Sequence, residues 1–275
     1  MKKTDSPDEL RSLARQCRID IIEMLSRAGS GHPGGSLSAI DIITTLFFSK
    51  MNWDPKNPAW DDRDRFILSK GHGVPALYAV LAEAGAIAKE ELNTLRRINS
   101  RIQGHPDRAA LPVVEASTGS LGQGLSIAQG IALGLKLKKS PARVYCMMGD
   151  GEIQEGQVWE TIMSGPKFKL GNLVAIVDCN NGQIDGHVTE VMDLAPLADK
   201  WRAFRWHVQE VNGHSIEEIL IALDKTATPT DQPHAIIART VKGKGVSFME
   251  NNIGWHGMAP NPEETARALE ELRQR

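Results

Sequence analysis

Two apolar runs that each end in a polar, glycine-containing cluster constrain the fold of this chain more than any other feature. The run Arg143 to Met148 leads into Gly149-Asp150-Gly151, and the run Leu173 to Val177 leads into Asp178-Cys179-Asn180-Asn181-Gly182. Short continuous apolar runs are typical of strands buried on both faces of a parallel sheet. A helical stretch from about Glu155 to Lys167 separates them. The sequence therefore predicts a β-α-β unit with polar clusters at two strand ends.

The rest of the chain continues this alternation of strands and helices. Strands are expected at Arg65 to Ser69, His207 to Val211 and Ala235 to Ala238, and helices from Ser6 to near Gly29, Ser38 to Lys50, after Gly73, Gly122 to Leu135, Ser215 to Lys225 and Glu263 to Arg273, with loops at Ser30 to Gly35 and Gly243 to Pro262. This alternation predicts an α/β fold, a parallel sheet sandwiched by helices. We expect one domain over residues 1–275, on which residues 1–60 pack as an N-terminal helical extension.

Composition excludes several classes of partner. The net charge is −2, and no basic stripe or run predicts binding to nucleic acid or to an anionic membrane. The N-terminus has no apolar signal core, and no apolar run approaches the length needed to span a membrane. The three cysteines are widely spaced, which predicts neither disulfides nor a zinc site. Together these features predict a cytoplasmic protein.

The two polar clusters have the chemistry of a magnesium site. Ligands of an open parallel sheet bind outside the carboxyl ends of its strands, where Asp150 and Asn180 are both expected. Magnesium prefers hard oxygen ligands, which the Asp150 carboxylate, the Asn180 amide and a backbone carbonyl near Gly182 would supply. Gly149 and Gly151 let the backbone approach a phosphate closely. The alternative is that each cluster is only a turn, and two clusters at two strand ends argue against it.

Further motifs extend this pattern through the chain, each holding glycine or histidine. They are Ser30-Gly31-His32-Pro33-Gly34, the segment from Asp61 to Gly71-His72-Gly73, Gly104-His105-Pro106, Thr118-Gly119-Ser120-Leu121-Gly122-Gln123-Gly124, Ile184-Asp185-Gly186-His187-Val188 and Trp255-His256-Gly257. The clusters at Asp150 and Asn180 resemble the magnesium–diphosphate motif of thiamine-diphosphate enzymes. From about residue 10 to 260, the whole set resembles the transketolase family in order and content.

The resemblance implies a role for each matching residue. Magnesium, for which calcium or manganese would substitute, would be bound by Asp150, Asn180 and the carbonyl of Gly182. The cofactor, thiamine diphosphate, would be bound by His72, Gly119, Leu121, Gly151, Asn180 and His256. Gly119 and Leu121 would orient its aminopyrimidine ring through backbone atoms. The catalytic residues acting on the donor sugar would be His32, His105 and His256. Imidazole groups suit this chemistry because they donate, accept and transfer protons near neutral pH.

Several assignments stay open. Asn181 competes with Asn180 as the metal ligand, and the 30-residue step from Asp150 favours Asn180 by the resemblance. Lys242 and Lys244 either contact phosphate or form a solvated basic loop. Glu155 either joins an acidic network at a subunit interface, as the resemblance implies, or is an ordinary glutamate at a helix start. The remaining histidines are expected to be structural, or in one case to have no assigned role: His207, His214, His234 and His187.

The resemblance also implies the activity and its partner. Transketolases transfer a two-carbon ketol unit from a ketose to an aldose, usually as sugar phosphates. The glutamate that activates the cofactor, and most groups that hold the sugar phosphate, belong to a second, pyrimidine-binding domain, which would begin beyond Arg275. We therefore expect the N-terminal subunit of a split transketolase, paired with a C-terminal subunit in an α2β2 assembly.

Four alternatives are weighed against that expectation. They are a transketolase for unusual sugars, an enzyme like deoxyxylulose-phosphate synthase, the α subunit of a 2-oxo acid dehydrogenase, and a non-catalytic subunit that binds the cofactor. A fragment of a longer natural chain is also considered.

Overall fold

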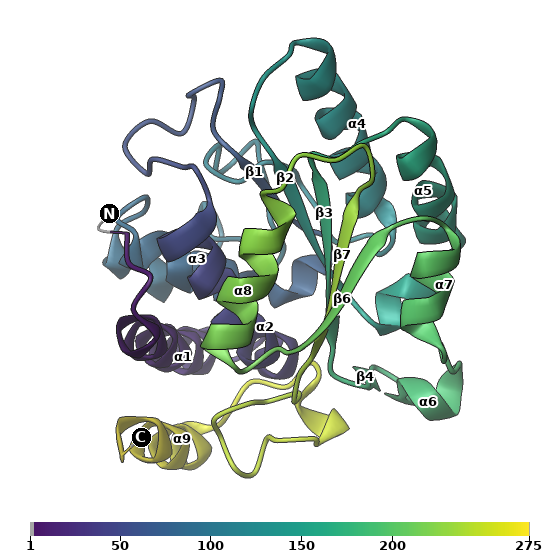
Figure 1. Ribbon diagram of the computed structural model, residues 1–275. Helices are drawn as coiled ribbons and strands as arrows, with labels where there is room; N and C mark the ends of the chain where they lie inside the picture. Colours follow the sequence, from purple (N-terminus) through teal and green to yellow (C-terminus); the bar gives the residue numbers. More distant parts are fainter. Residues whose placement is uncertain (1–2, 275) are drawn as a thin grey trace.

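A five-stranded parallel sheet lies at the centre of the computed structural model, which describes residues 3–274 (Figure 1). Its strand order is β1 (Arg65–Leu68), β2 (Val144–Gly149), β3 (Leu173–Cys179), β7 (His234–Arg239) and β6 (His207–Asn212). Gly149 pairs with Asp178 in the register of β2 and β3, so the two polar clusters leave the sheet at the same level. All five strand predictions are confirmed to within two residues at each end.

Helices cover both faces of the sheet. One face is covered by α2 (Pro33–Thr45), α3 (Val74–Glu83) and α8 (Ile216–Thr226), and the other by α4 (Gln123–Leu137), α5 (Gly156–Lys167) and α7 (Leu197–Ala203) (Figure 1). The long α1 (Pro7–Ala28) packs on α2 and α3, and the C-terminal α9 (Pro262–Gln274) packs on α1. The predicted α/β sandwich is therefore confirmed.

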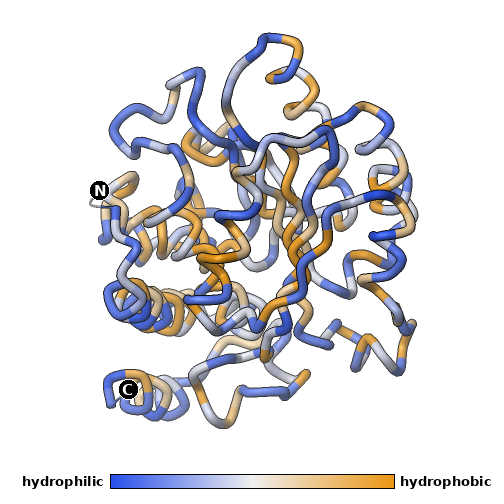
Figure 2. Tube along the Cα trace, viewed as in Figure 1, coloured by the Kyte–Doolittle hydropathy of each residue, from blue (hydrophilic) through white to orange (hydrophobic). Residues whose placement is uncertain are grey.

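The strands divide the interior into two hydrophobic clusters by simple alternation. Along β2, Tyr145 and Met147 point into the cluster beneath α2 and α3, whereas Val144, Cys146 and Met148 point into the cluster beneath α4 and α5. Successive side chains of a strand point to opposite faces, so a continuous apolar run is needed wherever both faces are covered. Figure 2 shows this concentration of hydrophobic residues along the central strands.

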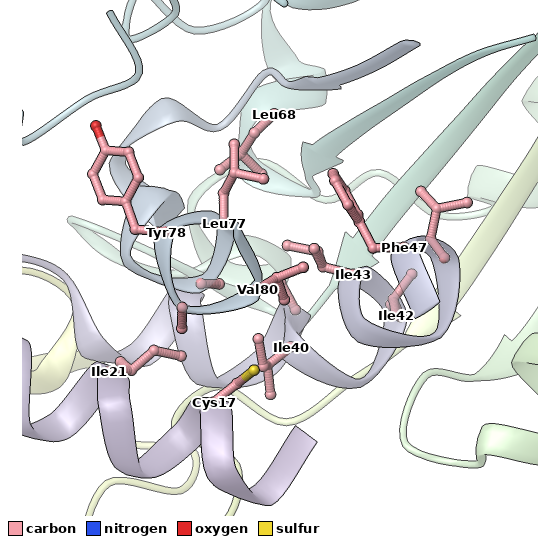
Figure 3. Packing of buried hydrophobic residues seen from close by; sticks show 14 of the residues in the cluster. Cys17, Ile21, Ile40, Ile42, Ile43, Phe47, Leu68, Leu77, Tyr78 and Val80 are labelled. Carbon is pink, nitrogen blue, oxygen red and sulfur yellow. The ribbon is translucent and has the colours of Figure 1, made fainter. Parts of the chain in front are cut away.

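The N-terminal helix α1 starts and stops at recognisable caps. The Ser6 hydroxyl accepts a hydrogen bond from the backbone N–H of Glu9 at 3.5 Å, Pro7 is the first helical residue, and Gly29 closes α1 in the left-handed region (φ 62°). Side chains of α1, α2 and α3 then converge in one part of the core, with Ile21, Ile40 and Val80 among them (Figure 3). The boundary of a separate extension at residue 60 stays a prediction.

The second helix begins earlier than predicted. It starts at Pro33 rather than Ser38, so the predicted loop from Ser30 to Gly35 ends at His32, and α-helical geometry gives way to a π-helical turn at Leu46–Lys50. The fixed φ of proline suits the first position of a helix. A Cβ on Gly34 would lie 2.9 Å from the carbonyl oxygen of Trp255, so glycine there permits close packing rather than a loop.

Several short elements were not predicted. They are α6 (Val188–Val191) and α7, the hairpin strands β4 (Gly182–Gln183) and β5 (Gly186–His187), and the 3₁₀ turns at Gly71–Gly73, Lys89–Thr94, Gly151–Gln154 and Ile253–Trp255. Such elements are too short to form by intrinsic propensity, and tertiary contacts stabilise them. In α7, for example, the buried Trp201 ring packs edge-on to Trp206 with centroids 4.8 Å apart. Within residues 3–274, no helix combines the length and apolar character needed to cross a bilayer.

Candidate active site

A cavity of about 350 Å³ opens at the carboxyl ends of β1, β2, β3 and β7. It brings together all of the site residues that the sequence analysis selected, from loops far apart in the chain. The lining includes His32, His72, His105, Gly119, Leu121, Asp150, Gly151, Asn180, Gly182 and His256. The location agrees with the rule that ligands of open parallel sheets bind beyond the carboxyl ends of the strands.

Four histidines form one wall of this cavity. The ring centroid of His32 lies 5.2 Å from His72, 5.7 Å from His256 and 6.4 Å from His105, and the rings of His72 and His256 are 5.2 Å apart. The Nδ1 atom of His32 is buried without a hydrogen-bond partner among the described residues. Buried polar atoms are seldom left without a partner in folded proteins, which sets His32 apart within this wall.

These histidines are neutral near pH 7. Burial and the charge of Arg96 lower the pKa of His32 to about 4, and burial and Lys242 lower that of His256 to about 3. Burial lowers the pKa of His72 well below its ordinary value, and burial and the charge of Arg96 lower that of His105. A neutral imidazole has one donor and one acceptor, which is the form needed to hydrogen-bond sugar hydroxyls and accept a proton.

Asp150 faces the histidines from the end of β2. Its two carboxylate oxygens accept backbone hydrogen bonds from Gly151 at 2.9 Å and Asn181 at 2.6 Å, which fixes the carboxylate between the two polar clusters. Burial and the nearby charge of Asp178 raise the pKa of Asp150 to about 6. A bound cation would reverse this penalty, because it stabilises the charged carboxylate.

The structure separates the two candidate asparagines. Asn180 is buried and lines the cavity, with its side-chain oxygen accepting the backbone N–H of Gly182 at 3.0 Å. Asn181 is in the left-handed region (φ 56°), is exposed, and uses its side-chain oxygen to accept the backbone N–H of Thr189 at 3.1 Å. This geometry favours Asn180 as the ligand.

Lys242 is buried, not part of a solvated loop. Only 2% of it is exposed, and its ammonium contacts the carbonyl oxygen of Gly182 at 3.1 Å and Nδ1 of His256 at 3.0 Å. Burial and repulsion from Lys70 lower its pKa to about 8. The Lys242 ammonium thus donates to the carbonyl that was predicted as a metal ligand. Lys244 points elsewhere and does not line the cavity.

A buried ionic network beneath the cavity was missed by the sequence analysis. Lys70 donates to the carbonyl of Gly35 at 2.7 Å and forms an ion pair with Asp178, which is completely buried. Ser38, at 2.5 Å, and Asn180, at 3.1 Å, also donate to Asp178. Burial acts to raise the pKa of Asp178, but Lys70 and the hydroxyl groups of Ser38 and Thr240 hold it below its ordinary value. The network therefore orients Asn180.

Glu152 is a second residue that the sequence analysis missed. It is buried at 3% exposure, and its carboxylate accepts the Ser69 hydroxyl and the backbone N–H groups of Gly122 at 2.9 Å and Gly149 at 3.1 Å. It therefore joins the glycine-rich segment to the end of β2. Its position two residues after Asp150, within the turn, was the only indication in the sequence. Glu155 lies at the N-cap of α5, is exposed, and lines the cavity edge.

The residues present fit a diphosphate and a divalent cation. A Cβ on Gly35 would lie 3.5 Å from Nε2 of His72, and one on Gly151 would lie 3.0 Å from the Gln183 side chain, so glycine keeps this part of the cavity open. Among residues 3–274 there is no group of three His, Cys, Asp or Glu side chains that could hold a metal. The candidate set instead mixes a carboxylate, an amide oxygen and a backbone carbonyl, which is the ligand chemistry of magnesium.

This fold and this arrangement of groups are those of the diphosphate-binding domains of thiamine-diphosphate enzymes. Comparison with known proteins narrows the class. The chain belongs to the transketolase family, because residues 10–273 match the family described as transketolase, thiamine diphosphate binding domain.

Similar proteins include separate subunits as well as full-length enzymes. The chain is 42% identical to the 6-deoxy-6-sulfo-D-fructose transketolase subunit of Clostridium sp. (strain MSTE9), over 96% of each chain. It is 41% identical to an apulose-4-phosphate transketolase subunit of Phocaeicola vulgatus, covering 97% of this chain and 94% of that one. The crystal structure of the Campylobacter jejuni transketolase superposes with a TM-score of 0.91 at 33% identity, and the match covers 98% of this chain but 43% of that one.

Proposed function

We propose that this chain is the N-terminal subunit of a two-chain transketolase. It would bind thiamine diphosphate and magnesium and, with a C-terminal subunit, transfer a two-carbon ketol unit from a ketose to an aldose. One observation supports this most strongly: Asp150, Asn180 and the Gly182 carbonyl lie in one cavity with His32, His72, His105 and His256. The similarity to transketolases and their subunits favours this activity over that of a 2-oxo acid dehydrogenase.

Each group has a proposed task. Asp150, Asn180 and the Gly182 carbonyl hold magnesium, while His72, Gly151 and His256 contact the diphosphate, and Gly119 and Leu121 orient the aminopyrimidine. When bound, the cofactor supplies the electron sink for cleavage of a carbon–carbon bond beside a carbonyl.

The donor sugar contacts three of the four histidines in this wall of the cavity. His32 and His105 hydrogen-bond its hydroxyl groups, and His256 stabilises the oxygen that gains charge as the carbonyl reacts. Their lowered pKa values keep the imidazoles neutral, so that each can both donate and accept. Loops and helix ends at the carboxyl edge of the sheet hold these groups around the cavity.

The partner is proposed from the relatives. Relatives of nearly the same length are named as subunits, whereas this chain spans less than half of full-length transketolases such as the human enzyme, of which it covers 43%. We propose that a C-terminal subunit supplies the pyrimidine-binding domain, and that the two chains form an α2β2 assembly in the cytoplasm. Glu155, exposed at the cavity edge, is the proposed contact to a neighbouring subunit.

The substrates are proposed as sugar phosphates. Two relatives are named for 6-deoxy-6-sulfo-D-fructose and for apulose 4-phosphate, so the donor panel should include those sugars beside pentose phosphates.

The test is a ketol-transfer assay with thiamine diphosphate and magnesium. This chain is assayed alone, mixed with the product of the adjacent reading frame, and mixed with a known transketolase C-terminal section. We expect activity only in a mixture, and the donor panel then identifies the sugar. Turnover by the purified chain alone at ordinary enzyme rates would overturn the two-chain proposal. Failure to bind the cofactor in any mixture, measured by calorimetry, would overturn the assigned function.

A further inference from the structure

A second cavity, of about 390 Å³, lies between α1, the start of α8 and the loop that follows β7. It shares no lining residue with the active site, and the family assignment gives it no role. Its lining is rich in cationic side chains, together with two carboxylates and a serine: Asp8, Arg11, Ser12, Arg15, Arg18, Asp41, His214, Lys244, Gly245 and Leu272. We refer to it as the basic cavity.

Most charges in the basic cavity are already paired. Arg18 is buried and holds Asp41 through two hydrogen bonds of 2.7 and 2.8 Å, and Arg11 pairs with Asp8 at 2.7 Å. Lys244 contacts Glu250 at a longer 3.3 Å. Arg15, a half-buried residue of the lining, makes no hydrogen bond or ion pair with any of residues 3–274. Its guanidinium therefore has no anionic partner among those residues, although two carboxylates line the same cavity.

Hydrogen bonds connect the lining of the basic cavity to the loop that carries Lys242. Nε of Arg18 donates to the carbonyl of Lys244 at 3.1 Å, and His214 bridges Asp41, at 2.7 Å, to the backbone N–H of Val241, at 2.8 Å. The loop held by these two contacts begins one residue before Lys242. Its outer side faces the basic cavity, while Lys242 on its inner side contacts Gly182 and His256.

We propose that the basic cavity binds the phosphate group of a small phosphorylated metabolite, and that its occupancy shifts the loop from Val241 to Gly245 and with it Lys242. A guanidinium binds phosphate through two parallel N–H groups, and the Lys244 ammonium and Ser12 hydroxyl line the same space as further donors. Asp8 at the rim is an acceptor for hydroxyl groups of a polyol phosphate. The volume is that of a small-ligand site.

Phosphate binding is tested on the full chain by amide NMR at constant ionic strength. Inorganic phosphate and glycerol 3-phosphate are titrated against matched sodium chloride. We expect saturable shifts at Ser12, Arg15 and Gly245, and at least about tenfold weaker binding in Arg15→Gln because a charge-assisted contact is lost. Arg27→Gln, on the same helix outside the basic cavity, is the matched control and should bind as wild type. Equal phosphate affinity in Arg15→Gln and wild type would overturn the site.

The proposed effect of phosphate binding on Lys242 is measured separately, in the same NMR titration. The Lys242 amide signal should shift with the same midpoint as Gly245 in the wild-type chain, and this shift should disappear in Arg15→Gln. A Lys242 shift that persists in that variant would mean phosphate binding in the active site, and would overturn transmission from the basic cavity. If Arg15→Gln did not fold, Arg15→Lys keeps the charge without the planar fork and should weaken binding by about threefold.

Discussion

Two pairs of histidines with the same ring geometry lie at opposite ends of the sheet. His72 and His256, at the carboxyl ends, have centroids 5.2 Å apart and an interplanar angle of 31°. His207 and His234, paired in register at the amino ends of β6 and β7, have the same separation and angle. Burial lowers the pKa of His256 and of His234 alike, to about 3 and about 4. Ring geometry and a lowered pKa therefore do not by themselves distinguish a candidate active site.

The surroundings distinguish the two pairs. The carboxyl-end pair faces Asp150, Lys70, Lys242 and glycine backbone in one cavity. The amino-end pair borders a cavity of about 310 Å³ that includes Lys225 and two threonines but no carboxylate. One pair thus sits among the groups proposed to bind a cation and a diphosphate, and the other beside a cavity that has no such set of groups. The comparison predicts that equivalent changes at the two ends have unequal effects.

The largest difference is expected in stability. Lys70→Met removes one member of a completely buried ion pair and leaves Asp178 charged and unpaired, which should cost about 3–5 kcal/mol. His234→Leu removes a buried imidazole whose Nε2 has no partner among the described residues, and should stay within about 1 kcal/mol of wild type. Urea denaturation of both variants measures the contrast. Similar losses of unfolding free energy in the two variants would show that the buried network at the carboxyl ends contributes no more to stability than His234 does.

Cofactor binding should depend on one end only. Asp150→Ala should weaken magnesium-dependent binding of thiamine diphosphate by at least about 100-fold, because a charged ligand is lost. Asp231→Ala removes an exposed carboxylate near the start of β7 and is the matched control. Calorimetry with and without magnesium measures both. An unchanged affinity in Asp150→Ala would refute the metal assignment.

The histidine pairs themselves give a smaller contrast. His72→Gln should weaken cofactor binding by about tenfold, since a hydrogen bond to a charged diphosphate is lost. His207→Gln, at the amino ends, should leave the affinity within about twofold of wild type, because that residue is remote from the carboxyl-end cavity. The comparison fails if the two variants bind alike.

Much of this contrast could be predicted from the sequence. Apolar runs predicted the strands, and the glycine context of His32, His72, His105 and His256 separated them from His207, His214 and His234. His214 indeed has a structural position, bridging Asp41 and Val241. Glycine beside a histidine marks a close backbone approach, which is a local property that sequence can show.

The supporting residues could not be predicted in the same way. Lys70, Asp178 and Glu152 are polar residues in buried positions. The partners that make these positions stable lie more than 25 residues away in sequence. The local sequence pattern does not indicate these ion pairs and hydrogen bonds, because the partners meet only when the strands assemble into the sheet. For the same reason Lys242 could not be placed until the loop after β7 was seen against Gly182.

The last contrast is a dependence of stability on pH. Burial and the charge of His207 lower the pKa of His234 from 6.5 to about 4. Between these values the unfolded chain binds a proton that the folded chain does not, so stability is lost as pH falls from 6.5 towards 4. After allowance for partial solvent screening, the contribution of His234 to this loss between pH 7 and 5 should be about 1 kcal/mol.

His234→Leu isolates that contribution. The variant should lose less stability than wild type between pH 7 and 5, while the loss caused by His32, whose pKa is also about 4, stays common to both proteins. Urea denaturation at the two pH values measures the difference. Parallel losses in both proteins would mean that His234 titrates normally, and that only the histidines at the carboxyl ends are held neutral by their surroundings.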